Sequence, residues 1–199
     1  ASVAIVEKEF IGGTCLNVGC IPTKTFFRSS KLFAECRQGA AFGVDIAGLT
    51  FNMAAVVQRK NEIVSTLTRG VDGLLKRSGV EVVRGHATLT SKSTVQVGEL
   101  TLTAKNILIA TGARPVVPPI PGIDSPCVVD SSGVLNLTEL PKTVAVIGGG
   151  YIGLEFASFF AAAGAEVTVL EMLPQIATGS DHDISSRLQQ ALKKSGIVF

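Results

Sequence analysis

The sequence predicts an α/β fold built from two consecutive units, each made of a parallel sheet and helices. Three observations predict this class: an apolar strand pattern that ends in an acid at residues 2–7, a proline-rich stretch at 115–126, and an ordered series of strand, glycine turn, helix, strand and acid at 143–171. Alternating strands and helices of this kind form parallel sheets. We therefore expect one unit at residues 1–114, a hinge and linker at 115–142, and a second unit at 143–199.

The composition indicates a globular protein. Of the 199 residues, 46% are hydrophobic and 17% are charged, and the net charge is +2, a balance typical of folded domains. The lysines and arginines are scattered, which argues against nucleic acid or an anionic membrane surface as a partner. No apolar run reaches the length of a membrane span, and no signal peptide is visible. Four cysteines are few for a secreted disulfide scaffold, so we expect a reducing, cytoplasmic compartment.

The first unit is predicted to contain two helices between short strands. Residues 22–35 have helical composition, and apolar residues recur at three- and four-residue spacing over 52–77. Gly79 ends the second helix. The other segments have the apolar runs or the alternation typical of strands. These predicted strands are 2–7, 80–84, a hairpin within 88–103, and 105–110.

The second unit opens with a strand and a glycine-rich turn. An apolar strand at 144–147 runs into Gly148, Gly150 and Gly153, which satisfy the GxGxxG pattern, and a helix then extends to about Ala163. Each glycine has a physical role in such a motif: the first makes the tight turn, the second lets a pyrophosphate approach the backbone, and the third lets helix and strand pack closely. The helix N-terminus then faces the phosphate charge.

An acid follows the next strand at the required distance. Gly164 stops the helix, a strand follows at 166–170, and Glu171 ends it. The whole series predicts a Rossmann unit, whereas an isolated GxGxxG would be weak. Glu171 can accept hydrogen bonds from both ribose hydroxyls and would repel a 2′-phosphate, which predicts NAD rather than NADP. FAD or another nucleotide at this site remains the alternative. Further on, Ser180 and Asp181 can cap a last helix.

Two cysteines five positions apart stand near the start of the chain. On an ideal helix, the Cα atoms of residues i and i+5 lie about 8.7 Å apart, whereas a disulfide needs roughly 4.4–6.8 Å. Cys15 and Cys20 can therefore bond only if the chain is broken or wound more tightly, which Gly19 and Pro22 permit. Cys20 would lie by the first turn of a helix, where a thiolate is favoured. The alternatives are a static disulfide or two unrelated thiols.

The run GGTCLNVGCIPTK at residues 12–24 is similar to the redox-active site of the class I pyridine nucleotide-disulfide oxidoreductases, which are flavin-dependent disulfide reductases. Within that family, the lipoamide-oxidising members are the closest resemblance. The resemblance extends over essentially the whole chain but over only part of a family member, and we expect both ends of such a member to be lacking. It implies a partial FAD-binding Rossmann-like domain at 1–114 and the first half of an NAD-binding Rossmann domain at 143–199.

The resemblance also implies roles for individual residues. Cys15 would be the thiol that exchanges with the substrate, and Cys20 would lie against the flavin. Lys24 would sit near flavin N5 and pair with Glu155, and Tyr151 would cover the nicotinamide pocket. The positions implied for FAD are Glu7, Lys8, Gly13, Thr14, Lys24, Gly85, His86, Ala87, Ala110, Thr111 and Gly112. Those implied for NAD are Gly148, Gly150, Tyr151, Ile152, Gly153, Glu155 and Glu171.

The implied activity passes electrons between dihydrolipoamide and NAD through FAD and the Cys15–Cys20 disulfide. Reduction of mercuric ion or of another disulfide is the alternative within the family, and a non-catalytic nucleotide-binding fragment is the alternative outside it. The family's histidine base lies in a domain that this chain does not contain, so we expect the 199 residues alone to be inactive. A homodimer and a 2-oxo acid dehydrogenase complex are the implied partners. No metal is expected, because capping explains Asp181-His182-Asp183 better than metal binding.

Overall fold

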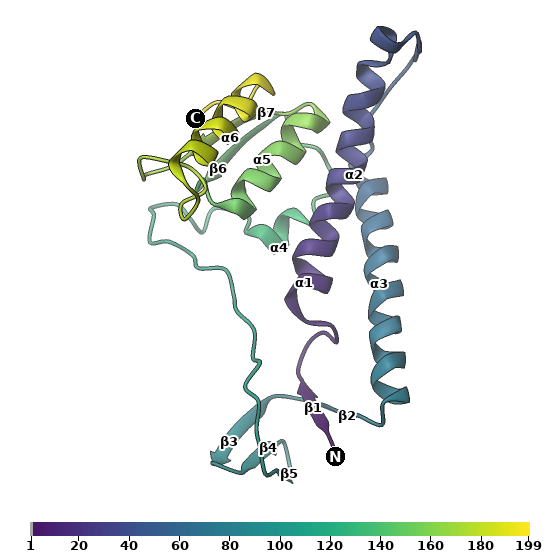
Figure 1. Cartoon of the computed structure of the whole chain (residues 1–199), viewed down its shortest axis with the longest axis vertical. Coiled ribbons are helices and arrows are strands. Elements are labelled where there is room, and N and C mark those ends of the chain that lie inside the picture. The colour runs from purple at the N-terminus through teal and green to yellow at the C-terminus, as the bar shows by residue number, and fades with distance from the viewer. Residues whose placement is uncertain (1) are drawn as a thin grey trace.

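The computed structural model describes residues 2–199 and has the mixed α/β architecture that the sequence predicts (Figure 1). Its helices are α1 (Gly13–Val18), α2 (Cys20–Arg37), α3 (Met53–Arg77), α4 (Ser131–Val134), α5 (Tyr151–Ala163) and α6 (His182–Lys194), with a 3-10 helix at Gly39–Phe42. Its strands are β1 (Ala4–Glu7), β2 (Glu81–Arg84), β3 (Ala87–Ser91), β4 (Thr94–Val97), β5 (Leu100–Thr103), β6 (Thr143–Ile147) and β7 (Glu166–Leu170).

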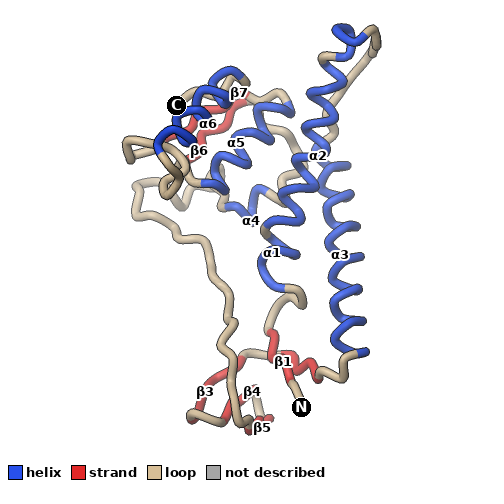
Figure 2. Tube along the Cα trace, viewed as in Figure 1, coloured by secondary structure: helices blue, strands red, loops and turns tan. Residues whose placement is uncertain are grey.

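The first sheet pairs the two strands that flank the long helices. β1 and β2 run parallel, with Ala4 opposite Glu81 and Glu7 opposite Arg84. The helices α2 and α3 form the crossover between them and lie side by side in Figures 1 and 2. Because β1 and β2 are parallel, their carboxyl ends meet at the same edge of the sheet. This arrangement confirms the strands predicted over 2–7 and 80–84.

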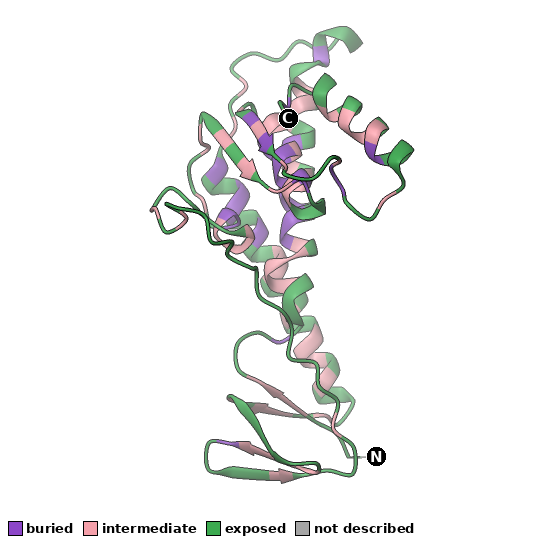
Figure 3. Ribbon diagram, turned by 90° about the vertical axis from the view of Figure 1, so that its left-hand side faces the viewer, coloured by how far each residue is buried: buried purple, intermediate pink, exposed green. Residues whose placement is uncertain are grey.

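The alternating segment forms a three-stranded antiparallel meander in the order β3-β4-β5. Every residue of β3 is exposed, and Figure 3 shows that this end of the molecule carries little buried surface. Gly98, at φ +58°, forms the turn between β4 and β5, a conformation that suits glycine. The predicted hairpin is confirmed and has one strand more than a simple hairpin.

The prediction of a strand over 105–110 was wrong. This segment is an irregular chain that runs from the meander toward the second unit, visible as a long tan tube in Figure 2. Leu108 is 90% exposed and Ile109 is 66% exposed. A strand requires a neighbour for its N–H and C=O groups, and none of the described strands pairs with this segment. An apolar run alone therefore does not suffice to form a strand.

The long helices begin at identifiable residues. The Asn52 side chain accepts a hydrogen bond from the Ala55 N–H at 3.0 Å and caps α3. Gly79, at φ +67°, follows the end of α3. α2 begins at Cys20, two residues before the predicted start, because the chain breaks at Gly19. The short helix α1 before this break was not predicted.

The second unit is built on two parallel strands. β6 pairs with β7 from Thr143 opposite Glu166 to Ile147 opposite Leu170, and α5 connects them. Gly164, at φ +108°, ends α5 as expected. Val198 adds a parallel bridge to β7 at Thr168.

The last helix, α6, forms where the sequence predicts it but lacks the predicted side-chain cap. Asp181 occupies the N-cap position without accepting a hydrogen bond there. The Ser180 hydroxyl bonds instead to the Tyr151 hydroxyl at 2.9 Å.

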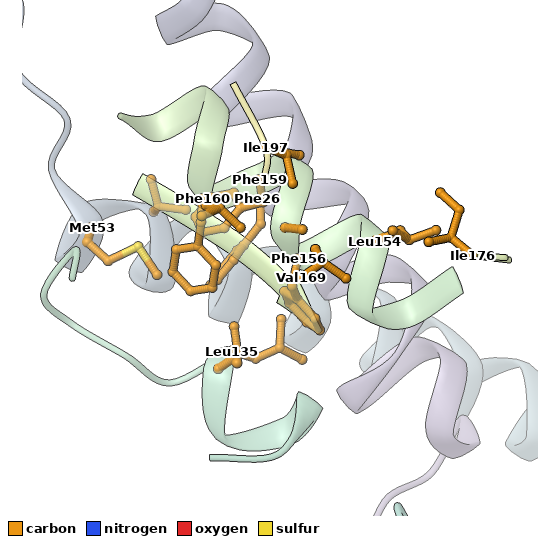
Figure 4. Close-up of a cluster of buried hydrophobic side chains, with 14 of the residues drawn as sticks. Phe26, Met53, Leu135, Leu154, Phe156, Phe159, Phe160, Val169, Ile176 and Ile197 are labelled. Carbon is orange, nitrogen blue, oxygen red and sulfur yellow. The ribbon is translucent and has the colours of Figure 1, made fainter. Parts of the chain in front are cut away.

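One hydrophobic core joins the helices of the first unit to the second unit. Phe26 of α2 lies against Phe159 of α5 with ring centroids 4.9 Å apart, and Phe159 meets Phe160 edge-on (Figure 4). α5 buries residues on two faces because it lies between α2 and the β6-β7 sheet. Figure 3 shows most of the buried residues in the upper half of the molecule. The core therefore fixes α2 against α5, which determines the geometry of the site below.

A buried lysine fastens the linker to α3. Lys60 is only 5% exposed, and its ammonium donates to the Asn136 side-chain oxygen, just after α4, at 3.3 Å. Burial lowers the pKa of Lys60, because the interior disfavours its charged form.

Candidate functional site

A break in the helix brings two thiols together. Cys15 lies on α1 and Cys20 is the first residue of α2, with Gly19 between the helices at φ −129° and ψ −116°. A Cβ at Gly19 would lie 3.0 Å from the Cys15 Cα, so a side chain there would press on the backbone that carries the first thiol. The break lets the two thiols approach, as the spacing predicts.

Both cysteines are exposed free thiols. A hydrogen bond with the Cys15 side chain is the main cause that raises the pKa of Cys20, and desolvation raises it further. The backbone at the start of α2 and the charge of Lys24 lower it by smaller amounts. The helix start therefore favours a thiolate as expected, but the neighbouring thiol outweighs it.

Thr23 holds the carbonyl at the break. The Thr23 N–H and hydroxyl both donate to the Gly19 carbonyl, at 3.1 and 2.7 Å. Thr23 is 5% exposed, so its own position is fixed by packing. The start of α2, and with it Cys20, is held by this pair of bonds.

A charge pair links α2 to α5 beside the thiols. The Lys24 ammonium forms an ion pair with the Glu155 carboxylate, across the contact that Phe26 and Phe159 create. Lys24 lies four residues after Cys20, on the same face of α2. The structure thus brings together Cys15, Cys20, Lys24 and Glu155.

The glycine turn at the start of α5 has the backbone that a phosphate group requires. Gly148 has φ +105°, and a Cβ at Gly153 would collide with the Gly148 carbonyl oxygen, so α5 lies very close to the turn. The first intrahelical bond runs from the Leu154 N–H to the Gly150 carbonyl at 2.9 Å. The N–H groups at 151–153 therefore face outward, as anion binding at a helix N-terminus needs.

Glu171 is fixed by backbone donors. One carboxylate oxygen accepts from the Gly149 N–H and the other from the Leu173 N–H, each at 2.7 Å. The bond from Leu173, followed by that from Gly149, lowers the pKa of Glu171. The carboxylate is thus held beside the glycine turn.

This lowered pKa predicts a pH-dependent contribution to stability. A carboxylate with a depressed folded-state pKa stabilises the fold above its unfolded value, about 4.3 for glutamate, and loses that contribution as the pH falls through the folded value. Compared with Glu171→Gln, the parent should be more stable at pH 7, and the difference should shrink below about pH 4.3. Urea unfolding at pH 7, 5, 4 and 3 measures it. A difference that persists unchanged at pH 3 would contradict the assignment.

Glu7 forms a similar arrangement in the first unit. One of its oxygens, Oε1, accepts from the Glu9 N–H at 2.7 Å and from the Phe10 N–H at 3.2 Å. The Gly85 N–H donates to the Glu7 carbonyl at 3.1 Å, so the turn after β2 lies beside the end of β1. Gly85 has φ +147°, and a Cβ there would lie 2.6 Å from Val97. The structure thus brings Glu7 to the segment at 85–87.

The remaining residues predicted to bind FAD or NAD make fewer contacts with one another. The Thr14 hydroxyl oxygen lies 3.8 Å from the place where Gly112 would carry a Cβ, so the turn at 110–112 approaches α1. Gly13, at φ +70°, is the first residue of α1. The following predicted residues are exposed: Lys8, His86, Ala87, Ala110, Thr111 and Ile152.

The whole chain, residues 1–199, matches the family model described as pyridine nucleotide-disulphide oxidoreductase. It belongs to this family. The chain is 44% identical over 202 residues to a dihydrolipoyl dehydrogenase of Acholeplasma laidlawii, covering 99% of this chain and 60% of that protein. It is 42% identical to a dihydrolipoamide dehydrogenase of Chaetomium thermophilum, covering 99% of this chain and 41% of that protein. The chain thus spans between about two-fifths and three-fifths of these relatives.

Solved structures of the family share the fold. The HOCl-induced flavoprotein disulfide reductase RclA from Escherichia coli superposes with a TM-score of 0.85 at 36% identity, covering 100% of this chain and 43% of that one. A Cu(II) complex of the same reductase gives a TM-score of 0.84 at 37% identity, again covering 43% of that chain. The predicted membership of the class I pyridine nucleotide-disulfide oxidoreductases and the Rossmann-type fold are confirmed.

The residues present fit the nucleotides that the family name implies. Gly153 leaves no room for a side chain against the turn, whereas a Cβ at Gly150 would meet nothing within 4 Å. The second glycine therefore opens onto free space at the helix N-terminus, where a pyrophosphate fits. Within residues 2–199, no group of three His, Cys, Asp or Glu side chains could hold a metal ion, and no helix is long and apolar enough to cross a membrane.

Two polar residues near the site, Asn17 and Thr23, were not singled out from the sequence, and Ser180 was singled out only as a helix cap. Asn17 bonds to backbone beside Cys15, Thr23 holds Gly19, and Ser180 bonds to Tyr151. Asn and Thr side chains often bond to nearby backbone, so the bonds of Asn17 and Thr23 could have been predicted from the sequence. Ser180 lies 29 residues from Tyr151, and no local pattern could have connected them.

Proposed function

We propose that this chain carries the redox and dinucleotide-binding part of an FAD-dependent disulfide oxidoreductase that passes electrons between dihydrolipoamide and NAD. The observation that carries the proposal is the chain break at Gly19, which sets Cys15 of α1 and Cys20 of α2 on its two sides, beside the Lys24–Glu155 ion pair. Relatives named dihydrolipoyl dehydrogenase support the choice of substrate.

In the proposed reaction, the Cys15–Cys20 disulfide takes two electrons from the substrate dithiol. A substrate thiolate attacks the Cys15 sulfur, which forms a mixed disulfide and releases Cys20 as a thiolate. The second substrate sulfur then attacks the first substrate sulfur, which is bonded to Cys15, so that the substrate disulfide forms and Cys15 is released. The balance is one dithiol oxidised, one disulfide reduced, and two protons transferred to the enzyme thiols.

FAD supplies the two-electron chemistry that connects the reduced cysteines to NAD. Glu7 and the segment at 85–87 would hold its adenosine, and Thr14 and the turn at 110–112 would flank the rest. Lys24, held by Glu155, places a positive charge four residues from Cys20. That charge favours anionic groups next to the thiol.

The second unit would bind NAD. Gly148, Gly150 and the start of α5 would hold the pyrophosphate, and Glu171 would accept the ribose hydroxyls. Because Glu171 is held as a carboxylate by two N–H donors, a 2′-phosphate would meet a negative charge. Tyr151 would cover the nicotinamide. A homodimer, a 2-oxo acid dehydrogenase complex as partner and a cytoplasmic location belong to the same proposal.

The test compares cofactors and substrates on the full-length enzyme loaded with FAD. Reduction of NAD by dihydrolipoamide should exceed reduction of NADP by about 100-fold, because like-charge contacts cost several kcal/mol. NADH-dependent reduction of lipoamide should exceed that of oxidised glutathione and of mercuric ion. Faster turnover of glutathione or mercuric ion would replace the substrate, and the absence of any disulfide turnover would overturn the function.

A further inference from the structure

The helix that carries Cys15 is weakly held by packing. α1 has six residues, none of them buried, and no side chain caps its N-terminus. Isolated helices this short are unstable. Gly12, at φ +97°, precedes α1, and Gly13, at φ +70°, is its first residue. Gly19 follows the helix. Something other than helix propensity must therefore keep Cys15 in place.

Asn17 supplies that restraint from within the same helix. Its side-chain amide donates to the Ile11 carbonyl at 3.0 Å and to the Gly13 carbonyl at 2.9 Å. Ile11 is only 4% exposed, so the first of these bonds ties α1 to a residue that packing already fixes. The amide thus fastens the glycine loop onto the helix that carries Cys15.

The other end of the Asn17 side chain faces α3. The Thr68 hydroxyl lies 3.4 Å from the Asn17 oxygen and 2.8 Å from the Val64 carbonyl. A hydroxyl has one hydrogen to donate, so the nearer Val64 carbonyl takes most of it. The bond from Thr68 to Asn17 is therefore weaker than the two bonds that the Asn17 amide donates.

We propose that Asn17 is a positioning residue that holds Cys15 on its side of the break at Gly19 and so favours the Cys15–Cys20 disulfide over the dithiol. The inference rests on the proposed function, because it concerns the same cysteine pair. Thr23 already fixes the Cys20 side of the break through Gly19. Asn17 performs the same task on the Cys15 side. A disulfide tolerates only a narrow range of Cα separations, so movement of α1 weakens it.

The measurement is the exchange of the full chain with glutathione. Oxidised glutathione and the two thiols give the Cys15–Cys20 disulfide and two reduced glutathiones, so two electrons and two protons pass to glutathione. Asn17→Leu keeps the shape and removes both donors. Because two hydrogen bonds are lost, the equilibrium constant for disulfide formation should fall about tenfold, or ~30 mV for a two-electron couple.

Three further variants control the experiment. Asn17→Ala should shift the equilibrium in the same direction, and Thr68→Val, which keeps both amide donors, should shift it less than about threefold. Asn52→Ala removes the cap of α3 and lowers stability by about 1 kcal/mol, but it should leave the exchange with glutathione unchanged. Circular dichroism shows which variants are folded at the temperature of the measurement.

The outcomes separate this inference from the proposed function. If the parent forms the disulfide and both Asn17 variants match it within about twofold, the positioning role is wrong and the function stands. If Asn52→Ala shifts the exchange as much as Asn17→Leu does, the effect is general destabilisation and the positioning role is again wrong. If the parent forms no Cys15–Cys20 disulfide, the proposed function itself fails.

Discussion

Replacing Cys20 by serine in the full-length enzyme is expected to abolish disulfide turnover. A serine hydroxyl cannot form the bond with Cys15 that stores the two electrons, so the loss should reach about 1,000-fold or more, as for other removed nucleophiles. Two-electron reduction of the FAD-loaded enzyme should also fail to give a long-wavelength thiolate-to-flavin band. Stopped-flow spectroscopy and a lipoamide-coupled NADH assay measure the two effects.

The neighbouring cysteines provide the controls. Cys15→Ser should lose turnover equally but keep the long-wavelength band, because Cys20 is assigned to the flavin. Cys36 is half-buried and lies outside the pair, and Cys127 is within 3.2 Å of the Ser125 hydroxyl. Serine at either of these positions should leave turnover intact. A Cys20→Ser enzyme that retains more than about a tenth of parent turnover would contradict the assignment.

The sequence predicted the elements whose signals are local. Apolar periodicity located α3, the order of strand, glycines, helix and acid located β6 to Glu171, and alternation located the meander. In each case the residues that determine the element lie within it or at its ends. The cysteine spacing even required a break in the chain, and Gly19 provides it.

The features that the sequence did not predict correctly depend on residues elsewhere in the chain. The segment at 105–110 has a strand composition, but strand formation depends on a neighbour that the composition does not specify. α1 begins with Gly13, a residue with poor helix propensity, and its Asn17 side chain bonds back to Ile11 and Gly13. The Lys24–Glu155 pair spans 131 residues, and only the family resemblance placed these two side chains together.

Alanine substitutions of Gly153 and Gly150 should distinguish a glycine that packing requires from a glycine that nucleotide binding requires. A Cβ at Gly153 would collide with the Gly148 carbonyl oxygen and approach Val146 at 3.1 Å. Because the obstacle is backbone, α5 must move away from β6. Gly153→Ala should therefore destabilise the protein by about 1–3 kcal/mol, the usual range for overpacking, and should weaken NADH binding as well. Urea unfolding and NADH fluorescence titration measure both effects.

Gly150→Ala adds the same methyl group three residues earlier and provides the matched comparison. Gly150 has φ −74° and ψ 172°, which any residue adopts, and its added Cβ would meet nothing within 4 Å. The fold should therefore tolerate alanine to within about 0.5 kcal/mol. The methyl group would instead occupy the space assigned to the pyrophosphate, so NADH affinity should fall at least about tenfold. If Gly150→Ala bound NADH as tightly as the parent, the pyrophosphate would have to lie elsewhere, even though the turn has the right shape.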